Sequence, residues 1–152
     1  MSTQLQALEL WRTSLVASVR SDAPDLSARQ MALLLCVYLG AGPHTVRGLA
    51  KDLKISKPAI SRALDRLGEL GYIRRERDDL DRRNVLVQRT PEGGVFLTNF
   101  SKMIMDAQTH SAAIPDHQAL DFAFESLSAA AAAMGSPTEE KTAPSAWSNV
   151  AA

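Results

Sequence analysis

Two short segments with apolar stripes, joined by about three residues, constrain this chain more than any other feature. In the second segment, about residues 57–70, apolar residues recur every three or four positions and so line one face of an α-helix. They are Ile60, Ala63, Leu64, Leu67 and Leu70. The first segment begins at Thr45, a suitable N-cap, and turns Val46, Leu49, Ala50 and Leu53 inward. The sequence therefore predicts two consecutive short helices on one core, ended by the helix-stop residue Gly71.

The solvent face of the second helix is basic and carries serine near its start. It presents Ser61, Arg62, Asp65, Arg66 and Glu69, with Ser56 and Lys57 at its N-terminal end. Two short helices with a tight connection and a basic second helix are typical of the helix-turn-helix, whose second helix enters the major groove of duplex DNA. Arg62 is the best candidate reader of guanine, because a guanidinium can bond the O6 and N7 atoms together.

A β-hairpin is predicted directly after these helices. Residues 72–76 and 84–89 are short and rich in β-branched or aromatic residues. The connector between them, residues 77–83, is strongly charged. We expect it to form a long exposed tip, which makes the hairpin a candidate wing against DNA; a merely solvated loop is the alternative.

Further helices flank this central segment. Apolar periodicity predicts a helix over residues 4–20 and a second that follows the capping box of Ser27 and Gln30 and runs to Leu39. Thr90-Pro91 starts another helix, and residues 116–134 form the last. The expected fold class is mostly α (α+β), a winged helix-turn-helix over residues 1–134 with N- and C-terminal dimerisation helices. Residues 135–152 are expected to be a disordered tail.

Charge is unevenly distributed along a chain whose formal net charge is zero. Residues 1–43 are balanced, whereas residues 44–90 hold twelve Lys and Arg against seven Asp and Glu. Residues 91–152 hold two Lys against seven Asp and Glu. A basic middle between neutral and acidic ends is the electrostatic footprint of a nucleic-acid binder, with chance clustering on a solvated face as the alternative.

The order of elements and the motifs together resemble the MarR (multiple antibiotic resistance regulator) family. The likeness rests on a serine-rich start of the second helix, Gly-Tyr-Ile-Arg-Arg at residues 71–75, Asp-Arg-Arg at residues 81–83 and Thr-Pro-x-Gly at residues 90–93. The resemblance implies a transcription regulator, expected to be a repressor, that binds a pseudo-palindromic operator in double-stranded DNA as a homodimer. It leaves a small-molecule effector open. The chain departs from the family pattern at Arg89, where an apolar residue is usual.

The candidate DNA-binding residues are polar or basic and come from three elements. They are Ser56, Lys57, Ser61, Arg62 and Arg66 in the recognition helix, Arg75, Arg77, Arg82 and Arg83 in the wing, and Thr45 and Arg47 at the start of the first helix. The resemblance adds Ala59 as a contact to a thymine methyl and places a wing-tip arginine in the minor groove. Asp81 is expected to orient an arginine. A plain N-cap explains Thr45 equally well, and pairing with an acidic neighbour explains Arg66 equally well. Pairing with Asp65 or Glu69 on an exposed helix face is the alternative for Arg62 too.

Other classes of function fit less well. No nucleophile and base, glycine-rich phosphate loop or pair of catalytic carboxylates can be picked out, so we expect neither an enzyme nor a cofactor. Asp106 and His110 with His117 and Asp121 could converge on a metal, but we expect solvated polar positions and no metal. A winged helix that binds protein remains the alternative. An apolar or acidic solvent face on the second helix would favour this alternative, but that face carries Arg62 and Arg66.

The remaining expectations concern the compartment and the lone cysteine. No apolar run reaches the roughly 18 residues of a membrane span, and the N-terminus lacks a signal-peptide pattern. A single cysteine cannot form an intramolecular disulfide. We therefore expect a cytoplasmic protein. Cys36 lies in an apolar run, which predicts an inert buried thiol in preference to a peroxide sensor.

Overall fold

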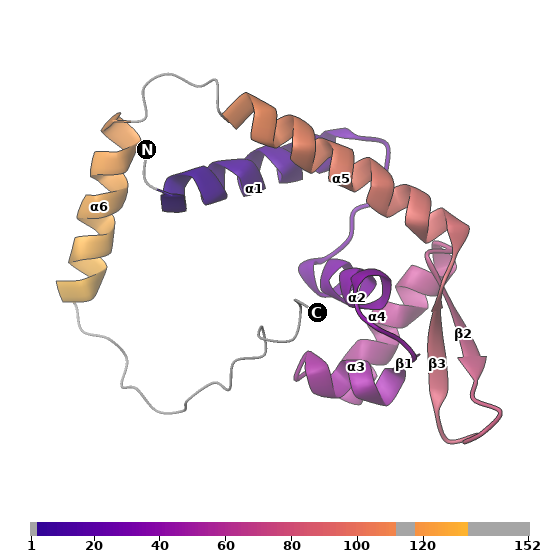
Figure 1. Cartoon of the computed structure of the whole chain (residues 1–152). Coiled ribbons are helices and arrows are strands. Elements are labelled where there is room, and N and C mark those ends of the chain that lie inside the picture. The colour runs from indigo at the N-terminus through magenta and orange to yellow at the C-terminus, as the bar shows by residue number, and fades with distance from the viewer. Residues whose placement is uncertain (1–2, 112–117, 134–152) are drawn as a thin grey trace. The chain divides into compact units, whose positions relative to one another are not determined.

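The chain folds into helices and one small sheet that belong to two compact units. The computed structural model describes residues 3–111 and 118–133 (Figure 1). One unit consists of residues 16–103, and the other of residues 1–15 together with residues 104–152. Helices α1 (Thr3–Arg20) and α5 (Pro91–Ser111) each contribute to both units.

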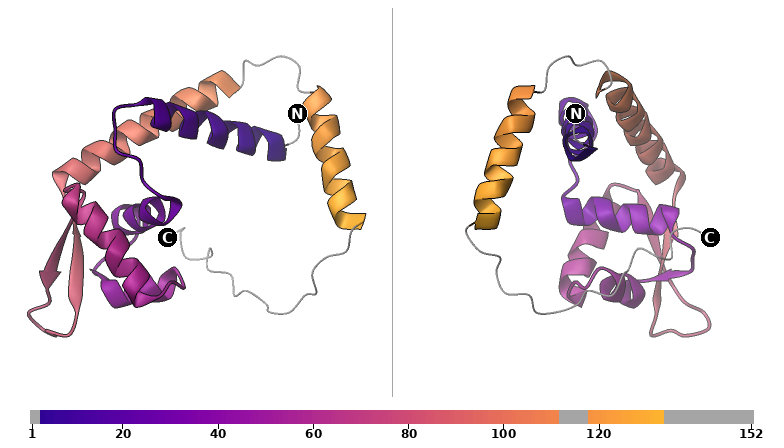
Figure 2. Two further views of the ribbon diagram at one scale, coloured as in Figure 1. Left: turned by 180° about the vertical axis from the view of Figure 1, so that it is seen from behind. Right: turned by 60° about the vertical axis from the view of Figure 1, so that its left-hand side comes forward.

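The unit of residues 16–103 is a winged helix-turn-helix, which confirms the predicted fold class. Its elements between α1 and α5 are α2 (Ala28–Leu39), β1 (His44–Thr45), α3 (Val46–Asp52), α4 (Lys57–Glu69), β2 (Ile73–Arg77) and β3 (Val85–Arg89). The strands pair antiparallel in the order β1-β3-β2, with His44 and Arg75 both opposite Val87. Figure 2 shows the β2–β3 hairpin extending beyond the helices of this unit.

One apolar core joins α2, α3, α4 and the sheet. Its fully buried members come from α2 and α4 and are Leu33, Leu34, Val37, Ile60, Leu64 and Leu67. Leu49, Ile73, Val87 and Phe96 add the contributions of α3, the sheet and α5. Burial of each large apolar side chain stabilises the fold by roughly 1.5–3 kcal/mol. Because the apolar face of α4 packs against this core, the opposite face of the helix is exposed to solvent.

Caps that the sequence predicted fix the helix ends. The Ser27 hydroxyl accepts a hydrogen bond from the Gln30 amide at 3.2 Å, and the Gln30 side chain accepts one from the Ser27 amide at 2.8 Å. Thr45 caps α3 by accepting from the Gly48 amide at 2.9 Å. Gly71 follows α4 with φ +74°, a left-handed conformation that glycine adopts without a steric penalty.

The structure departs from the sequence-based boundaries in a few places. Strand β1 was not predicted, since two residues carry no periodicity. Both hairpin strands start one residue later than predicted, and α4 ends at Glu69. Ser56 stands at the N-cap of α4 but makes no capping hydrogen bond with its side chain. The last helix, α6, spans Gln118–Ala133, and the predicted tail of residues 135–152 lies outside the described residues.

Apolar side chains stay at the surface in the unit of residues 1–15 and 104–152. Leu8 and Trp11 of α1 are at least half exposed, as are Met105 of α5 and Leu127 of α6. Ser14 is buried instead, and its hydroxyl donates to the Leu10 carbonyl at 2.7 Å. Within the described residues, no helix combines the length and the apolar character that crossing a membrane requires.

Candidate nucleic-acid interface

Helix α4 presents a basic face opposite the core. Lys57 and Arg62 are exposed, and no ion pair to either is found among the described residues. Pro58 stands in the first turn, where its missing N–H costs nothing. The N-terminus of the helix concentrates the positive end of the helix dipole beside Lys57. A phosphate or an acceptor-rich base edge would therefore meet unopposed positive charge here.

Other cations near α4 already have acidic partners. Arg75 of β2 donates to the Asp65 carboxylate of α4 at 2.5 Å, and Arg66 lies 3.7 Å from Glu69. The alternative considered for Arg66, an ion pair on the helix face, is thus present in the structure. Asp65 does not pair with Arg62. These exposed pairs are worth less than about 1 kcal/mol each, but they lower the net positive charge that Arg66 and Arg75 offer to DNA.

The other predicted residues of α3 and α4 differ in accessibility. Arg47 is exposed, whereas the Thr45 hydroxyl is occupied in capping α3. Ser56 is exposed and Ser61 is half-buried. Ala59 is only 8% exposed, so its methyl group has little surface for the thymine contact that the family resemblance suggested. The contact of Ala59 with a thymine methyl stays a prediction that this burial makes less favourable.

The wing tip turns two of its carboxylates toward its own backbone. Asp78 Oδ1 accepts from the Leu80 amide at 2.9 Å, and Asp81 Oδ1 accepts from the Arg83 amide at 3.1 Å. Asp81 Oδ2 also accepts from the Asn84 side chain at 3.3 Å. Asp81 therefore holds the backbone turn at Arg83, whereas the sequence predicted that it orients a guanidinium.

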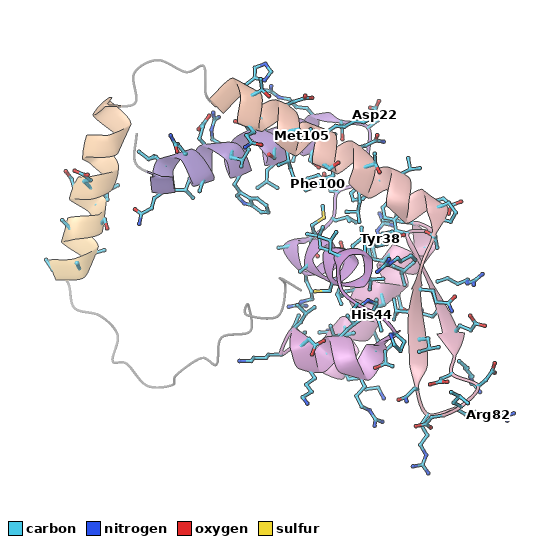
Figure 3. All side chains as sticks on the ribbon, in the orientation of Figure 1. Asp22, Tyr38, His44, Arg82, Phe100 and Met105 are labelled. Atoms are coloured by element: carbon cyan, nitrogen blue, oxygen red, sulfur yellow. The ribbon has the colours of Figure 1, made fainter. Side chains whose placement is uncertain are left out.

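The wing arginines remain available to a ligand. Arg77, Arg82 and Arg83 are exposed and form no ion pair within the described part of the chain. Figure 3 shows Arg82 at the tip of the hairpin, pointing away from the helices of its unit. The carboxylates of Asp78 and Asp81 accept hydrogen bonds from the loop backbone and do not pair with these guanidinium groups.

Two basic residues, one in the last turn of α3 and one in the α3–α4 connection, were not among the predicted contacts. Lys51 and Lys54 are exposed, and Lys54 has the left-handed φ of 51° that lets the chain reverse between the helices. The charge count of residues 44–90 included them, but no motif singled them out. They extend the positive surface from α4 toward the end of α3.

Metal binding stays an untested alternative. Among the side chains that the structure describes, no three His, Cys, Asp or Glu residues gather as a metal site would require. His110 instead approaches the Asp106 carbonyl through Nδ1 at 2.7 Å. His117 lies outside the described residues, and the side chain of Asp121 is not described either.

Cys36 is half-buried in α2, and burial raises the pKa of its thiol, an effect to which the Asp52 carboxylate adds. A raised pKa lowers the fraction of reactive thiolate near neutral pH. We therefore expect a thiol reagent to label Cys36 slowly in the native protein and quickly after unfolding in urea. Mass spectrometry of timed samples measures both rates. Rapid native labelling that also abolishes DNA binding would instead make Cys36 a sensor.

Comparisons with known proteins agree with the fold. Residues 25–84, which contain α2 to β2 and the whole wing tip, match the model of the MarR family. No curated protein sequence matches the chain. Among solved structures, Staphylococcus aureus MepR, described as a transcription regulator of a multidrug efflux pump, is 15% identical with a TM-score of 0.60. The match covers 87% of this chain and 94% of MepR.

Two further solved structures have the same fold. A MepR variant bound to an oligodeoxyribonucleotide is 16% identical with a TM-score of 0.62, over 87% of this chain and 94% of that one. A transcriptional regulator from Thermotoga maritima is 17% identical with a TM-score of 0.56, over 86% of both chains. Fold and surface thus define a winged helix-turn-helix protein. Residues 25–84 are in addition similar to the MarR family, whose model they match.

Proposed function

We propose that this chain is a sequence-specific regulator of transcription that binds double-stranded DNA as a homodimer and acts as a repressor. Helix α4 enters the major groove, and the wing tip of residues 77–83 lies at the minor groove. The observation that carries the proposal is Arg62, which is exposed on the face of α4 opposite the core and has no ion pair among the described residues. An unpaired guanidinium on such a helix suits the two acceptors of a guanine edge.

Phosphate contacts complete the proposed footprint. Arg47, Lys57, Arg82 and Arg83 are exposed cations on the first helix of the motif, the recognition helix and the wing. Phosphate contacts position a protein on the duplex, whereas base contacts specify the sequence. The oligodeoxyribonucleotide in the MepR variant structure supports DNA as the partner by analogy.

The function is tested by selection from a random duplex library followed by titration of the selected sequence. We expect an enriched pseudo-palindrome whose half-sites lie one helical turn apart, as a two-fold dimer with two recognition helices requires. We also expect the slope of binding against salt concentration to be steep. Failure to enrich any sequence, together with no salt-dependent affinity for duplex DNA, would favour the protein-binding alternative.

Dimerisation through a second copy of this chain is the next expected result. Trp11 and Leu8 of α1 and Met105 of α5 expose large apolar side chains, which are costly to leave in water. Closed two-fold symmetry lets one surface patch cover the same patch on its partner. Light scattering at micromolar concentration should give twice the chain mass. A monomer at that concentration would contradict the proposal, and replacement of Trp11 by Ser should shift the wild-type dimer toward monomer.

A further inference from the structure

Tyr38, near the end of α2, carries a hydroxyl that lies among three backbone groups. Its oxygen is 2.9 Å from the Tyr72 carbonyl oxygen, 2.8 Å from the Thr90 carbonyl oxygen and 2.8 Å from the Thr90 amide nitrogen. The hydroxyl accepts from the amide and donates its one proton to a carbonyl. Thr90 continues the network, because its side-chain oxygen donates to the Gly71 carbonyl at 2.6 Å.

Arg89 binds the end of α2 from the other side of this network. Its Nε donates to the Val37 carbonyl at 2.8 Å, and its Nη2 donates to the Gly40 carbonyl at 2.9 Å. The last carbonyls of a helix lack partners within the helix and lie at the negative end of its dipole. A guanidinium therefore suits this position well, which explains why the chain has a cation where the family pattern has an apolar residue.

Tyr38, Arg89 and Thr90 together form what we call the wing-base clamp. The clamp joins the end of α2 to the two places where the hairpin is rooted. One root is the turn of Gly71 and Tyr72 between α4 and β2, and the other is the junction at Thr90 between β3 and α5. The Tyr72 ring also stacks on Phe96 of α5, with ring centroids 4.6 Å apart.

Beyond the clamp, the hairpin is anchored by the ion pair of Arg75 with Asp65 of α4, by pairing of β3 with the short strand β1 and by two buried side chains. In β2 only Ile73 is buried and the other four residues are exposed, and in β3 only Val87 is buried. The third strand, β1, is two residues long. An isolated two-stranded hairpin is marginally stable in water, so its direction depends on what holds its base.

We propose that the wing-base clamp is a positioning device for DNA binding, which sets the wing at a fixed place relative to α4 without itself touching DNA. This inference rests on the proposed function, in which α4 enters the major groove of DNA and the wing tip lies at the minor groove, because it concerns the placement of the wing relative to α4. If the clamp opens, the wing samples several directions relative to α4. Only the molecules whose wing has the binding-competent direction can then bind DNA through both elements. The affinity then falls by the fraction of molecules with the wing in place.

The first test uses the free protein and is independent of DNA. Tyr38→Phe removes the hydroxyl and leaves the ring, and Arg89→Met removes the guanidinium and keeps an unbranched stem. We expect backbone amides of β2 and β3 to exchange with deuterium about five-fold faster in either variant, with the buried amides of α4 unchanged. The control is Leu33→Val, a core change in α2 away from the clamp. Equal acceleration in all elements would make the clamp merely structural and overturn the proposal.

The second test measures coupling in DNA binding. On the selected operator, Tyr38→Phe should lower affinity about five-fold in the wild-type background and in Arg62→Ala. Tyr38→Phe should leave the affinity unchanged when Arg82 and Arg83 are both replaced by alanine. A wing without these cations makes no contact whose strength depends on the direction of the wing. An equal loss in all three backgrounds would overturn the positioning role. Absence of any wild-type DNA binding would refute the proposed function instead, and the exchange result would still decide whether the clamp holds the wing.

Discussion

Replacement of Arg62 by alanine should lower affinity for the operator by about 1–3 kcal/mol per half-site and leave binding to random duplex nearly unchanged. A bidentate contact to guanine contributes only when that base is present, so its loss removes specificity first. With two recognition helices in the proposed dimer, both half-sites lose the contact. Titration of operator and scrambled duplex at several salt concentrations measures the ratio of the two affinities directly.

Arg66→Ala is the matched control for this experiment. It removes the same charge from the same helix, but Arg66 already lies 3.7 Å from Glu69. Its loss should therefore affect operator and random duplex alike and only slightly. An unchanged operator-to-random ratio in Arg62→Ala would show that this face of α4 does not read bases.

Replacement of Arg82 and Arg83 gives the opposite pattern. These arginines lie on the wing, whose expected targets are the backbone and the minor groove. Binding to all sequences should weaken, and the salt slope should fall by roughly one unit for each lost phosphate contact. The two sets of variants thus separate base reading by α4 from positioning by the wing.

Gly93→Ala should cost about 3 kcal/mol of stability, the largest folding effect that we expect from a single methyl group in this chain. A Cβ atom at Gly93 would overlap the Tyr38 hydroxyl and the Tyr72 carbonyl oxygen. The first atom belongs to the wing-base clamp and the second is a backbone oxygen bonded to it, so the strain cannot be relieved by moving one flexible side chain. Thermal unfolding followed by circular dichroism should show a midpoint lowered by several degrees.

The neighbouring Gly94 provides the control for this prediction. A Cβ atom there would lie 4.0 Å from the nearest atom, Tyr38 Cε1, which is an ordinary contact. Since alanine is favoured over glycine inside a helix by about 1 kcal/mol, Gly94→Ala should stabilise the fold. Two adjacent glycines should thus respond to the same substitution with opposite signs. A stable Gly93→Ala variant would mean that the clamp does not pack as described.

Much of this fold was predictable because its signals are local. The apolar spacing of residues 60–67 and the caps at Ser27 and Thr45 depend on neighbours within a few positions, and each predicted the element that the structure shows. The clamp was not predictable in this way. Tyr38 meets Tyr72 and Thr90 across 34 and 52 positions of sequence, and nothing near Tyr38 indicates those partners.

In the candidate DNA-binding surface, too, local features were predictable from the sequence and long-range contacts were not. The sequence predicted the basic face of α4, since helical spacing decides which residues lie opposite the core. It could not show that Asp65 pairs with Arg75, because that contact requires β2 to fold back beside α4.

The inward-turned carboxylates of Asp78 and Asp81 have a consequence for the thermodynamics of association. Each ties down a backbone amide of the wing tip before any partner arrives. Ordering a free loop costs roughly 1–2 kcal/mol of conformational entropy for each residue fixed. A tip that is already organised pays that cost during folding, so more of the attraction between its arginines and phosphate remains as net affinity. Aspartates that would by charge alone oppose DNA thus preorganise the loop that we propose as its minor-groove contact.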